Sequence, residues 1–180
     1  MRIGIDVSQL AYPGTGVANY LENLVEHLLE VDKKNEYVLF YSSLRRNFQF
    51  LIFNFQSNSN VSIRKFKIPP TLLEILWNRL HIFPIERLIG HIDLFITSDW
   101  IEPPMEHAKK ATIIYDLVVY KYPKETAKKI VDTQKRKLKW VKKESDVIFT
   151  ISESSKKDII EILGIDSEKI KVVCPGISKS

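Results

Sequence analysis

Short apolar segments that alternate with longer amphipathic ones run through this chain and restrict the folds open to it. The short segments have the length of strands and are largely apolar, which is typical of strands buried on both faces of a sheet. They cover residues 2–7, 37–41, 61–66, 93–97, 111–115, 147–151 and 169–173. The longer segments have the apolar spacing of helices and cover residues 17–30, 71–80, 84–90, 124–144 and 154–163. This alternation predicts an α/β fold in which helices cover both faces of a mainly parallel sheet.

The size and composition of the chain are those of one domain. Its 180 residues are enough for a well-buried core, and its longest apolar runs are far shorter than the roughly 18 residues of a membrane span. A strand follows Met1 directly, in place of a signal peptide, so we expect a cytoplasmic protein. The single cysteine, Cys174, has no disulfide partner, and we expect a buried or half-buried thiol at the end of a strand. Neither further cysteines nor clustered histidines indicate a metal site.

Positive charge is concentrated in one expected helix. Residues 124–144 contain nine Lys or Arg and three Asp or Glu, a net charge of +6, whereas the whole chain carries +5. Ile130, Val131, Leu138 and Val141 form an apolar stripe that predicts burial of one face of this helix. The basic remainder fits a solvated surface or contact with anionic lipid headgroups. Nucleic acid is a disfavoured partner, because no recognition module or set of stacking aromatic residues accompanies the charge.

A glycine-bearing loop joins the first expected strand to the first expected helix. Gly14 and Gly16 permit turn conformations and let a ligand approach the backbone, while Thr15 can cap the helix. The exposed N–H groups and positive end of such a helix can hold an anionic group, although a plain loop with a helix cap fits the same residues. A dinucleotide-binding turn is disfavoured, because Asn19 stands in the place of its third glycine. In addition, the second strand ends at Ser42 without a carboxylate for a ribose.

Ligands of parallel α/β sheets bind outside the carboxyl ends of the strands. That rule selects the loops at residues 8–16, 98–104, 116–123 and 152–155. Nine short segments in and around these loops form a recognisable series of motifs. They are Ile3–Asp6, Thr15–Tyr20, Asn23–Leu24, Tyr115–Leu117, Tyr122–Pro123, Ser145–Asp158, Leu163–Ile165, Lys169–Val173 and Pro175–Ile177. In this order and spacing, over nearly the whole chain, they resemble the amino-terminal half of the retaining group 1 (family four) nucleotide-sugar glycosyltransferases.

The resemblance implies a Rossmann-like, doubly wound, mainly parallel sheet that forms one half of a GT-B architecture. Residues 1–174 would be the amino-terminal, acceptor-side domain, and residues 175–180 would begin the linker to a donor-binding domain that is absent from this sequence. The implied reaction moves a sugar from a nucleotide diphosphate sugar to an acceptor hydroxyl. Because the family's paired glutamates lie in the second domain, we expect this fragment to be inactive alone. Two alternatives remain open, namely a separate binding subunit of a split glycosyltransferase and a different Rossmann-type nucleotide-binding protein.

The resemblance also assigns residues to the cleft between the two domains. The N–H groups near Gly14, Thr15 and Gly16 would hold the donor diphosphate, with no metal ion or other cofactor required. Tyr115 and Asp116 stand at the catalytic positions. The family has a histidine where Tyr115 stands, and a phenol is a poor substitute for a titrating imidazole. Asp116 fits either a catalytic carboxylate or a residue that fixes the following loop. The residues expected to bind the acceptor are Asn19, Ser98, Asp99, Trp100 and Glu102.

The implied partners are a nucleotide-sugar donor and a saccharide or lipid-linked acceptor. Trp100 fits stacking on either kind of acceptor, and it equally fits packing beneath its own loop. With a lipid-linked acceptor, the basic segment 124–144 and the apolar segment 72–77 become candidate contacts with an anionic membrane. The protein would then lie peripherally on the inner face of that membrane. Segment 72–77 also fits a place in the core.

Overall fold

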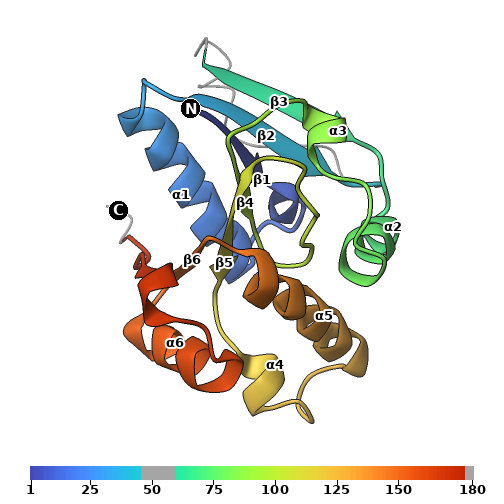
Figure 1. Ribbon diagram of the computed structural model, residues 1–180, viewed down its shortest axis with the longest axis vertical. Helices are drawn as coiled ribbons and strands as arrows, with labels where there is room; N and C mark the ends of the chain where they lie inside the picture. The colour runs from blue at the N-terminus through green and yellow to red at the C-terminus, as the bar shows by residue number, and fades with distance from the viewer. Residues whose placement is uncertain (46–59, 177–180) are drawn as a thin grey trace.

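Seven parallel strands form one sheet in the part of the chain that this computed structural model describes, residues 1–45 and 60–176 (Figure 1). The strands are β1 Arg2–Asp6, β2 Glu36–Ser42, β3 Val61–Phe66, β4 Leu94–Thr97, β5 Lys109–Ile114, β6 Val147–Thr150 and β7 Ile170–Val172. Their order is β3-β2-β1-β4-β5-β6-β7, so the chain fills the sheet from β1 towards one edge and then crosses back to fill the other side. This reversal confirms the predicted Rossmann-like, doubly wound sheet.

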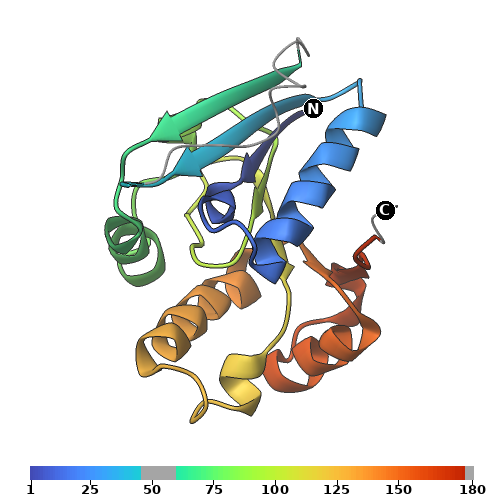
Figure 2. The same cartoon turned by 180° about the vertical axis from the view of Figure 1, so that it is seen from behind.

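Helices cover both faces of the sheet (Figures 1 and 2). Helix α1, Gly16–Val31, packs on the face that presents Ile3 and Ile5 of β1. The other face presents Val38 and Phe95 and is covered by the remaining helices. Their bounds are α2 Pro70–Leu73, α3 Glu86–Ile89, α4 Val118–Lys121, α5 Lys128–Glu144 and α6 Glu153–Asp158. Because successive side chains of a strand point to opposite faces, each apolar strand contributes to both layers of the core.

The boundaries of several helices differ from the predicted ranges. The helix expected at 71–80 consists of α2 followed by a π-helical turn at Glu74–Arg79. Helix α6 likewise continues into a π-helical turn, Ile159–Leu163, which ends at the left-handed Gly164. Helix α5 begins four residues later than predicted, because Glu125 N–H donates to the Tyr122 carbonyl oxygen in a turn that follows α4. Helix α4 and two short 3-10 helices were not predicted, and the latter lie at Ser8–Ala11 and Ser167–Lys169.

The centre of strand β1 packs closely because it carries Gly4. A Cβ at Gly4 would lie 2.6 Å from Phe95 Cδ2 and 3.1 Å from Ile89 Cδ1. Carbon atoms in van der Waals contact are about 3.5–4.0 Å apart, so a side chain there would displace the Phe95 ring or the Ile89 side chain. Gly4 therefore leaves room for these two side chains. The pairing of β1 with β4, from Ile3–Leu94 to Ile5–Ile96, brings the carboxyl ends of both strands together at the site described below.

The wall formed by α2 and its π-helical turn is joined to α5 by polar and aromatic contacts. Arg136 of α5 pairs with Glu74, with 2.7 Å between Nη2 and Oε1. The indole Nε1 of Trp140 donates to the Asn78 carbonyl oxygen at 2.9 Å, and its ring stacks on His81 with 3.6 Å between ring centroids. These contacts set the distance between the two helices that flank the site.

Exposure along the chain corrects one prediction and refines another. Cys174 is exposed, because β7 ends at Val172 and the chain then leaves the sheet, so the prediction of a buried or half-buried thiol is wrong. Within segment 72–77, Leu73 and Trp77 are buried in the core whereas Leu72 and Ile75 are exposed. Across residues 1–45 and 60–176, no helix has the length and hydropathy of a membrane-spanning segment. The sequence of residues 45–60 also fits a strand over residues 48–55 and predicts a turn at residues 57–60, and this stretch falls almost wholly outside the described residues.

Candidate functional site

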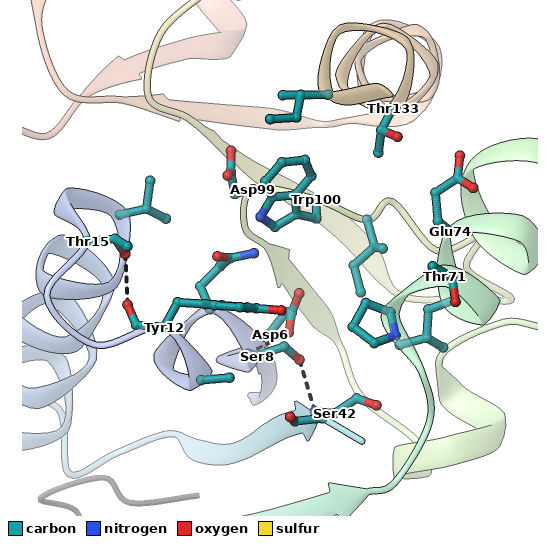
Figure 3. A pocket seen from close by; sticks show the side chains of 18 of the residues that line it. Asp6, Ser8, Tyr12, Thr15, Ser42, Thr71, Glu74, Asp99, Trp100 and Thr133 are labelled. Carbon is teal, nitrogen blue, oxygen red and sulfur yellow. Dashed lines mark hydrogen bonds between the residues drawn. The ribbon is translucent and has the colours of Figure 1, made fainter. Parts of the chain in front are cut away.

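A cavity of about 500 Å³ opens at the carboxyl ends of β1, β2 and β4, between α2 and α5 (Figure 3). It lies at the boundary between β1 and β4, on either side of which successive strands are added in opposite directions across the sheet. Open α/β sheets bind ligands at such a boundary. Polar residues in its lining include Asp6, Ser8, Thr15, Thr71, Glu74 and Asp99. Apolar residues include Pro70, Leu73, Trp100, Ile101 and Ile130.

Two carboxylates belong to this lining, one at the end of β1 and one directly after β4. Asp6 is 3% exposed, and its Oδ1 accepts a hydrogen bond from the Ser8 N–H at 2.9 Å. Burial raises the pKa of Asp6, against the lowering effect of Ser8 and of the charge on Lys137. Burial likewise raises the pKa of Asp99, against Lys137 and a 3.0 Å hydrogen bond from Gln134 Nε2 to Oδ1. Both carboxyl groups are therefore partly desolvated, which strengthens their hydrogen bonds to a bound ligand.

Trp100 and Ile101 supply an aromatic and an aliphatic side chain to the lining. The carbonyl oxygen of Trp100 accepts a 2.8 Å hydrogen bond from Asn78 Nδ2, and the N–H of Glu102 donates to Asn78 Oδ1 at 2.9 Å. One amide side chain thus fixes the backbone on both sides of Ile101. The indole of Trp100 consequently has a defined place among the side chains that face the cavity (Figure 3).

The glycine-bearing loop lies at the rim of the same cavity. Thr15 caps α1, since its Oγ1 accepts from the Ala18 N–H at 3.2 Å, and it also donates to the Tyr12 carbonyl oxygen at 3.0 Å. Gly14 has a φ of 83°, a conformation that favours glycine. A Cβ at Gly14 or Gly16 would meet no atom within 4 Å, so the loop backbone is open to a ligand. The positive end of a 16-residue helix therefore faces accessible space beside the cavity.

Tyr115, at the end of β5, packs behind this rim. Its ring meets Tyr20 of α1 edge-on, with 5.5 Å between centroids, and its hydroxyl lies 3.2 Å from Ser98 Oγ. The residue is 8% exposed, and burial raises the pKa of its hydroxyl. The phenol is therefore protonated at neutral pH and acts through hydrogen bonds.

The loops after β1, β4 and β5 thus converge on one edge of the sheet, where Tyr115 contacts Ser98 and where Thr15 and Asp99 line one cavity. Residues 14–180 match the sequence model of Glycosyltransferase Family 4. The chain belongs to glycosyltransferase family 4. Its general activity is accordingly the transfer of a glycosyl group from a donor to an acceptor. No curated protein sequence shows significant similarity to the chain.

Two of the five residues predicted to bind the acceptor, Asp99 and Trp100, line the cavity of this family 4 domain. Ser98 is 1% exposed and lies behind the lining, beside the Tyr115 hydroxyl. Asn19 is exposed on α1, where its carbonyl oxygen accepts from Asn23 Nδ2 at 2.8 Å, and it does not line the cavity. Asp99 and Trp100 therefore remain the acceptor candidates of that set.

Glu102, the fifth of these residues, lies in the interior of the family 4 domain. It is 0% exposed, and its carboxylate lies 2.7 Å from Thr97 Oγ1, 3.0 Å from Thr112 Oγ1 and 3.7 Å from Lys110 Nζ. An acceptor does not reach this carboxylate in the observed conformation. The structure gives Glu102 an internal, structural position in place of the predicted contact, because the chain turns inward after Ile101 and buries the carboxylate against β4 and β5.

Asp116 lies in the loop between β5 and α4. It is exposed, and its Oδ1 accepts a hydrogen bond from the Val118 N–H at 3.0 Å, which fixes the start of α4. This is the loop-fixing interaction considered from the sequence. The carboxylate is also accessible to solvent, so a catalytic contribution of Asp116 to the family 4 reaction stays a prediction.

Several residues that line the cavity were not selected from the sequence. Asp6 is the last residue of β1, and the rule that ligands bind at the carboxyl ends of strands was a signal that could have selected it. Thr133 and Ile130 come from α5, and Pro70 and Leu73 from α2. No spacing in the sequence indicates that these two helices flank one space. Among the described residues, no group of three or more His, Cys, Asp or Glu side chains has the arrangement of a metal site.

Proposed function

We propose that this chain is the amino-terminal, acceptor-side domain of a retaining glycosyltransferase that moves a sugar from a nucleotide diphosphate sugar to an acceptor hydroxyl. The observation that carries the proposal is the cavity in which Asp6, Asp99 and Trp100 face one space. Carboxylates accept hydrogen bonds from sugar hydroxyls, and an indole packs against the apolar face of a sugar ring. A volume of about 500 Å³ lies within the range of small-molecule sites and suits a short saccharide or the sugar end of a lipid-linked acceptor.

The donor diphosphate would lie beside the rim, at the N–H groups of Gly14, Thr15 and Gly16. The open space over both glycines and the positive end of α1 support this placement. The nucleotide and most of the diphosphate would be held by a second domain, reached through residues 175–180, and residues 1–174 alone would not turn over. Because the charge that develops on the diphosphate would be met by N–H groups and basic side chains, transfer would require no metal and would continue in EDTA.

The two residues at the end of β5 would have different parts in this reaction. Asp116 is the accessible carboxylate and the candidate to contact reacting hydroxyl groups. Tyr115 would position its surroundings by hydrogen bonding, because the raised pKa of its hydroxyl makes it unsuitable as a base near neutral pH.

Saturation-transfer NMR of the chain with methyl glycosides and disaccharides tests the acceptor site. We expect saccharide binding that is weakened about tenfold or more by Trp100→Ala, corresponding to about 1.4 kcal/mol of lost stacking. Asp99→Asn should also weaken binding, because a carboxylate accepts stronger hydrogen bonds than an amide. Glu30→Gln, an exposed change on α1, is the matched control and should have no effect. Saccharide binding that is unchanged in Trp100→Ala and Asp99→Asn would refute the assignment of this cavity.

Titration with NAD and with nucleotide sugars separates the remaining alternatives. Tight NAD binding would favour a different Rossmann-type nucleotide-binding protein. A split glycosyltransferase predicts that transfer appears only when a separate chain with a donor domain is added. An acceptor-side domain of one enzyme predicts saccharide binding by this chain and transfer by a chain that joins both domains.

The exposed face of α5 supports an anionic membrane as a further partner. Lys128, Lys135, Lys139, Lys142 and Lys143 are exposed there, and each basic residue near an anionic surface contributes about 1 kcal/mol. Exposed apolar side chains lie on the neighbouring wall, at Leu72, Ile75, Leu80, Ile82 and Phe83.

Co-sedimentation with vesicles tests this partner. Binding to phosphatidylglycerol vesicles should exceed binding to phosphatidylcholine vesicles and should fall with added salt, because exposed charges are screened over about 8 Å at physiological ionic strength. Equal binding to both kinds of vesicle would contradict a peripheral position at the anionic inner face.

A further inference from the structure

Helix α5 carries one lysine that points away from solvent. Lys137 is 1% exposed, whereas Lys135 and Lys139 on either side of it are exposed. Burial of a lysine ammonium costs free energy unless it is paired and hydrogen-bonded. The position of Lys137 therefore requires partners, and these belong to the loop after β4, which carries Trp100, and to nearby carboxylates.

Lys137 and two amide side chains hold three successive backbone carbonyl groups of the loop that carries Trp100. Lys137 Nζ donates a hydrogen bond to the carbonyl oxygen of Ser98. One turn earlier in α5, Gln134 Nε2 donates to the carbonyl oxygen of Asp99 at 3.0 Å. From the opposite wall, Asn78 Nδ2 donates to the carbonyl oxygen of Trp100 at 2.8 Å. The loop is thus held from both sides, by α5 and by the segment that continues α2.

The ammonium of Lys137 also lies within the electrostatic field of the cavity carboxylates. The charged groups that face it are Asp6 of β1, Asp99 and Glu102 of the loop, and Lys110 of β5. Burial lowers the pKa of Lys137, and the three carboxylates oppose that effect. In turn, the charge of Lys137 opposes the rise in pKa that burial causes at Asp6 and Asp99. An ionised carboxyl group accepts hydrogen bonds only, whereas a protonated one also donates, so this coupling favours the accepting form of Asp6 and Asp99.

We propose that Lys137 is a positioning residue of the cavity, which fixes the Ser98–Trp100 backbone and keeps Asp6 and Asp99 as hydrogen-bond acceptors. The saccharide nature of the ligand rests on the proposed function. The charge coupling is a property of the chain alone and is measurable without ligand.

Titration of the carboxyl carbons by ¹³C NMR tests this role in the unliganded chain. Asp6 and Asp99 resonances are assigned with Asp6→Asn and Asp99→Asn. Lys137→Met removes the charge and the donor at similar side-chain length, and we expect it to move the titration midpoints of both residues to higher pH. Lys139→Met, two residues away and exposed, is the matched control and should leave both midpoints unchanged.

A second pair of measurements keeps the proposal falsifiable if Lys137→Met does not fold. Asp99→Asn removes an opposite charge and should lower the titration midpoint of Lys137, followed at its ¹³Cε resonance. In protein labelled with 5-fluorotryptophan, Gln134→Leu should move or broaden the Trp100 resonance, which Trp100→Phe identifies, because the loop loses one of its three side-chain donors. Midpoints of Asp6 and Asp99 that do not respond to Lys137→Met, or a Lys137 midpoint that does not respond to Asp99→Asn, would overturn the proposal even if saccharides bind. Shifted midpoints in a chain that binds no saccharide would contradict the proposed function and leave the role of Lys137 intact.

Discussion

Replacement of Glu102 tests whether this carboxylate supports the fold or contacts the acceptor. Glu102→Ala removes the acceptor for Thr97 Oγ1 at 2.7 Å and Thr112 Oγ1 at 3.0 Å, and it removes the opposite charge 3.7 Å from Lys110 Nζ. A hydrogen bond to a charged group contributes about 1.5–3 kcal/mol, whereas the two threonine hydroxyls remain 2.7 Å apart and Lys110 Nζ keeps Glu144 at 2.8 Å. Because these remaining partners offset part of the loss, we expect a total loss of about 3–5 kcal/mol in the free energy of unfolding.

Thermal and urea unfolding of the chain measure this loss. In a domain of this size, 1 kcal/mol corresponds to about 2–4 °C, so Glu102→Ala should lower Tm by roughly 6–20 °C. Glu102→Gln retains an oxygen acceptor and should lose less, about 1–3 kcal/mol. The control is Glu106→Gln, four residues later, because the Glu106 side chain is 38% exposed and its ion pair with Arg87 contributes about 1 kcal/mol or less.

Binding measured on the same variants separates the two roles of Glu102. If the carboxylate is structural, Glu102→Gln binds saccharides like the unmodified chain at temperatures where it is folded. A Glu102→Ala variant that unfolds within 1 kcal/mol of the unmodified chain but no longer binds saccharides would refute the structural assignment and restore the acceptor contact predicted from the sequence.

Three further changes test the packing and the loops. Gly4→Ala should lower the free energy of unfolding in urea by about 1–3 kcal/mol, because the added Cβ would lie 2.6 Å from Phe95 Cδ2. A free energy of unfolding equal to that of the unmodified chain would contradict the close packing of β1. Glu86→Ala should lower the free energy of unfolding by about 1–3 kcal/mol, because Glu86 Oε1 accepts hydrogen bonds from three backbone N–H groups at 3.0–3.2 Å. An unchanged Tm would show that these hydrogen bonds do not stabilise the fold. Hydrogen bonds from Tyr37 and Asn35 hold the pKa of Asp32 well below its usual range, so its contribution to stability is complete above about pH 4 and is lost as the pH falls through the folded-state pKa. The stability difference between the unmodified chain and Asp32→Asn should therefore shrink between pH 6 and pH 3, and a constant difference would show that the carboxylate charge contributes nothing.

The sheet could be predicted from the sequence because its signal is local. Strand β2, for example, is buried from Tyr37 to Ser42, and a run of that length and apolarity fits few other structures. The alternation of strands and helices predicts a parallel sheet with right-handed crossovers but leaves the strand order open, and the doubly wound arrangement was implied by the family resemblance. The start of α5 could not be predicted, because the turn at Tyr122–Glu125 depends on how α4 packs and not on the helical spacing of residues 124–127.

The site was harder to predict because its residues meet only in three dimensions. Asp99 and Trp100 follow a strand directly, so the carboxyl-end rule selected them. The same rule also selected Glu102, because sequence does not reveal that the loop turns inward after Ile101. Lys137 was hidden for the opposite reason, since it is one of nine basic residues in a segment whose average character is that of a solvated surface. Its burial follows from the carbonyl and carboxylate groups brought to it by β1 and β4.

Helix α5 combines two duties that cannot be adjusted separately. Ile130 and Thr133 form one side of the cavity, while Gln134 and Lys137, on the next turn, donate hydrogen bonds to the backbone of the loop that carries Trp100. A tilt or translation of α5 would change the width of the cavity opening and the orientation of the Trp100 indole at the same time. Adaptation to a broader or narrower ligand is therefore expected through side-chain size at the exposed Pro70 and Thr71 on the facing wall, which can change without altering the hydrogen bonds from α5.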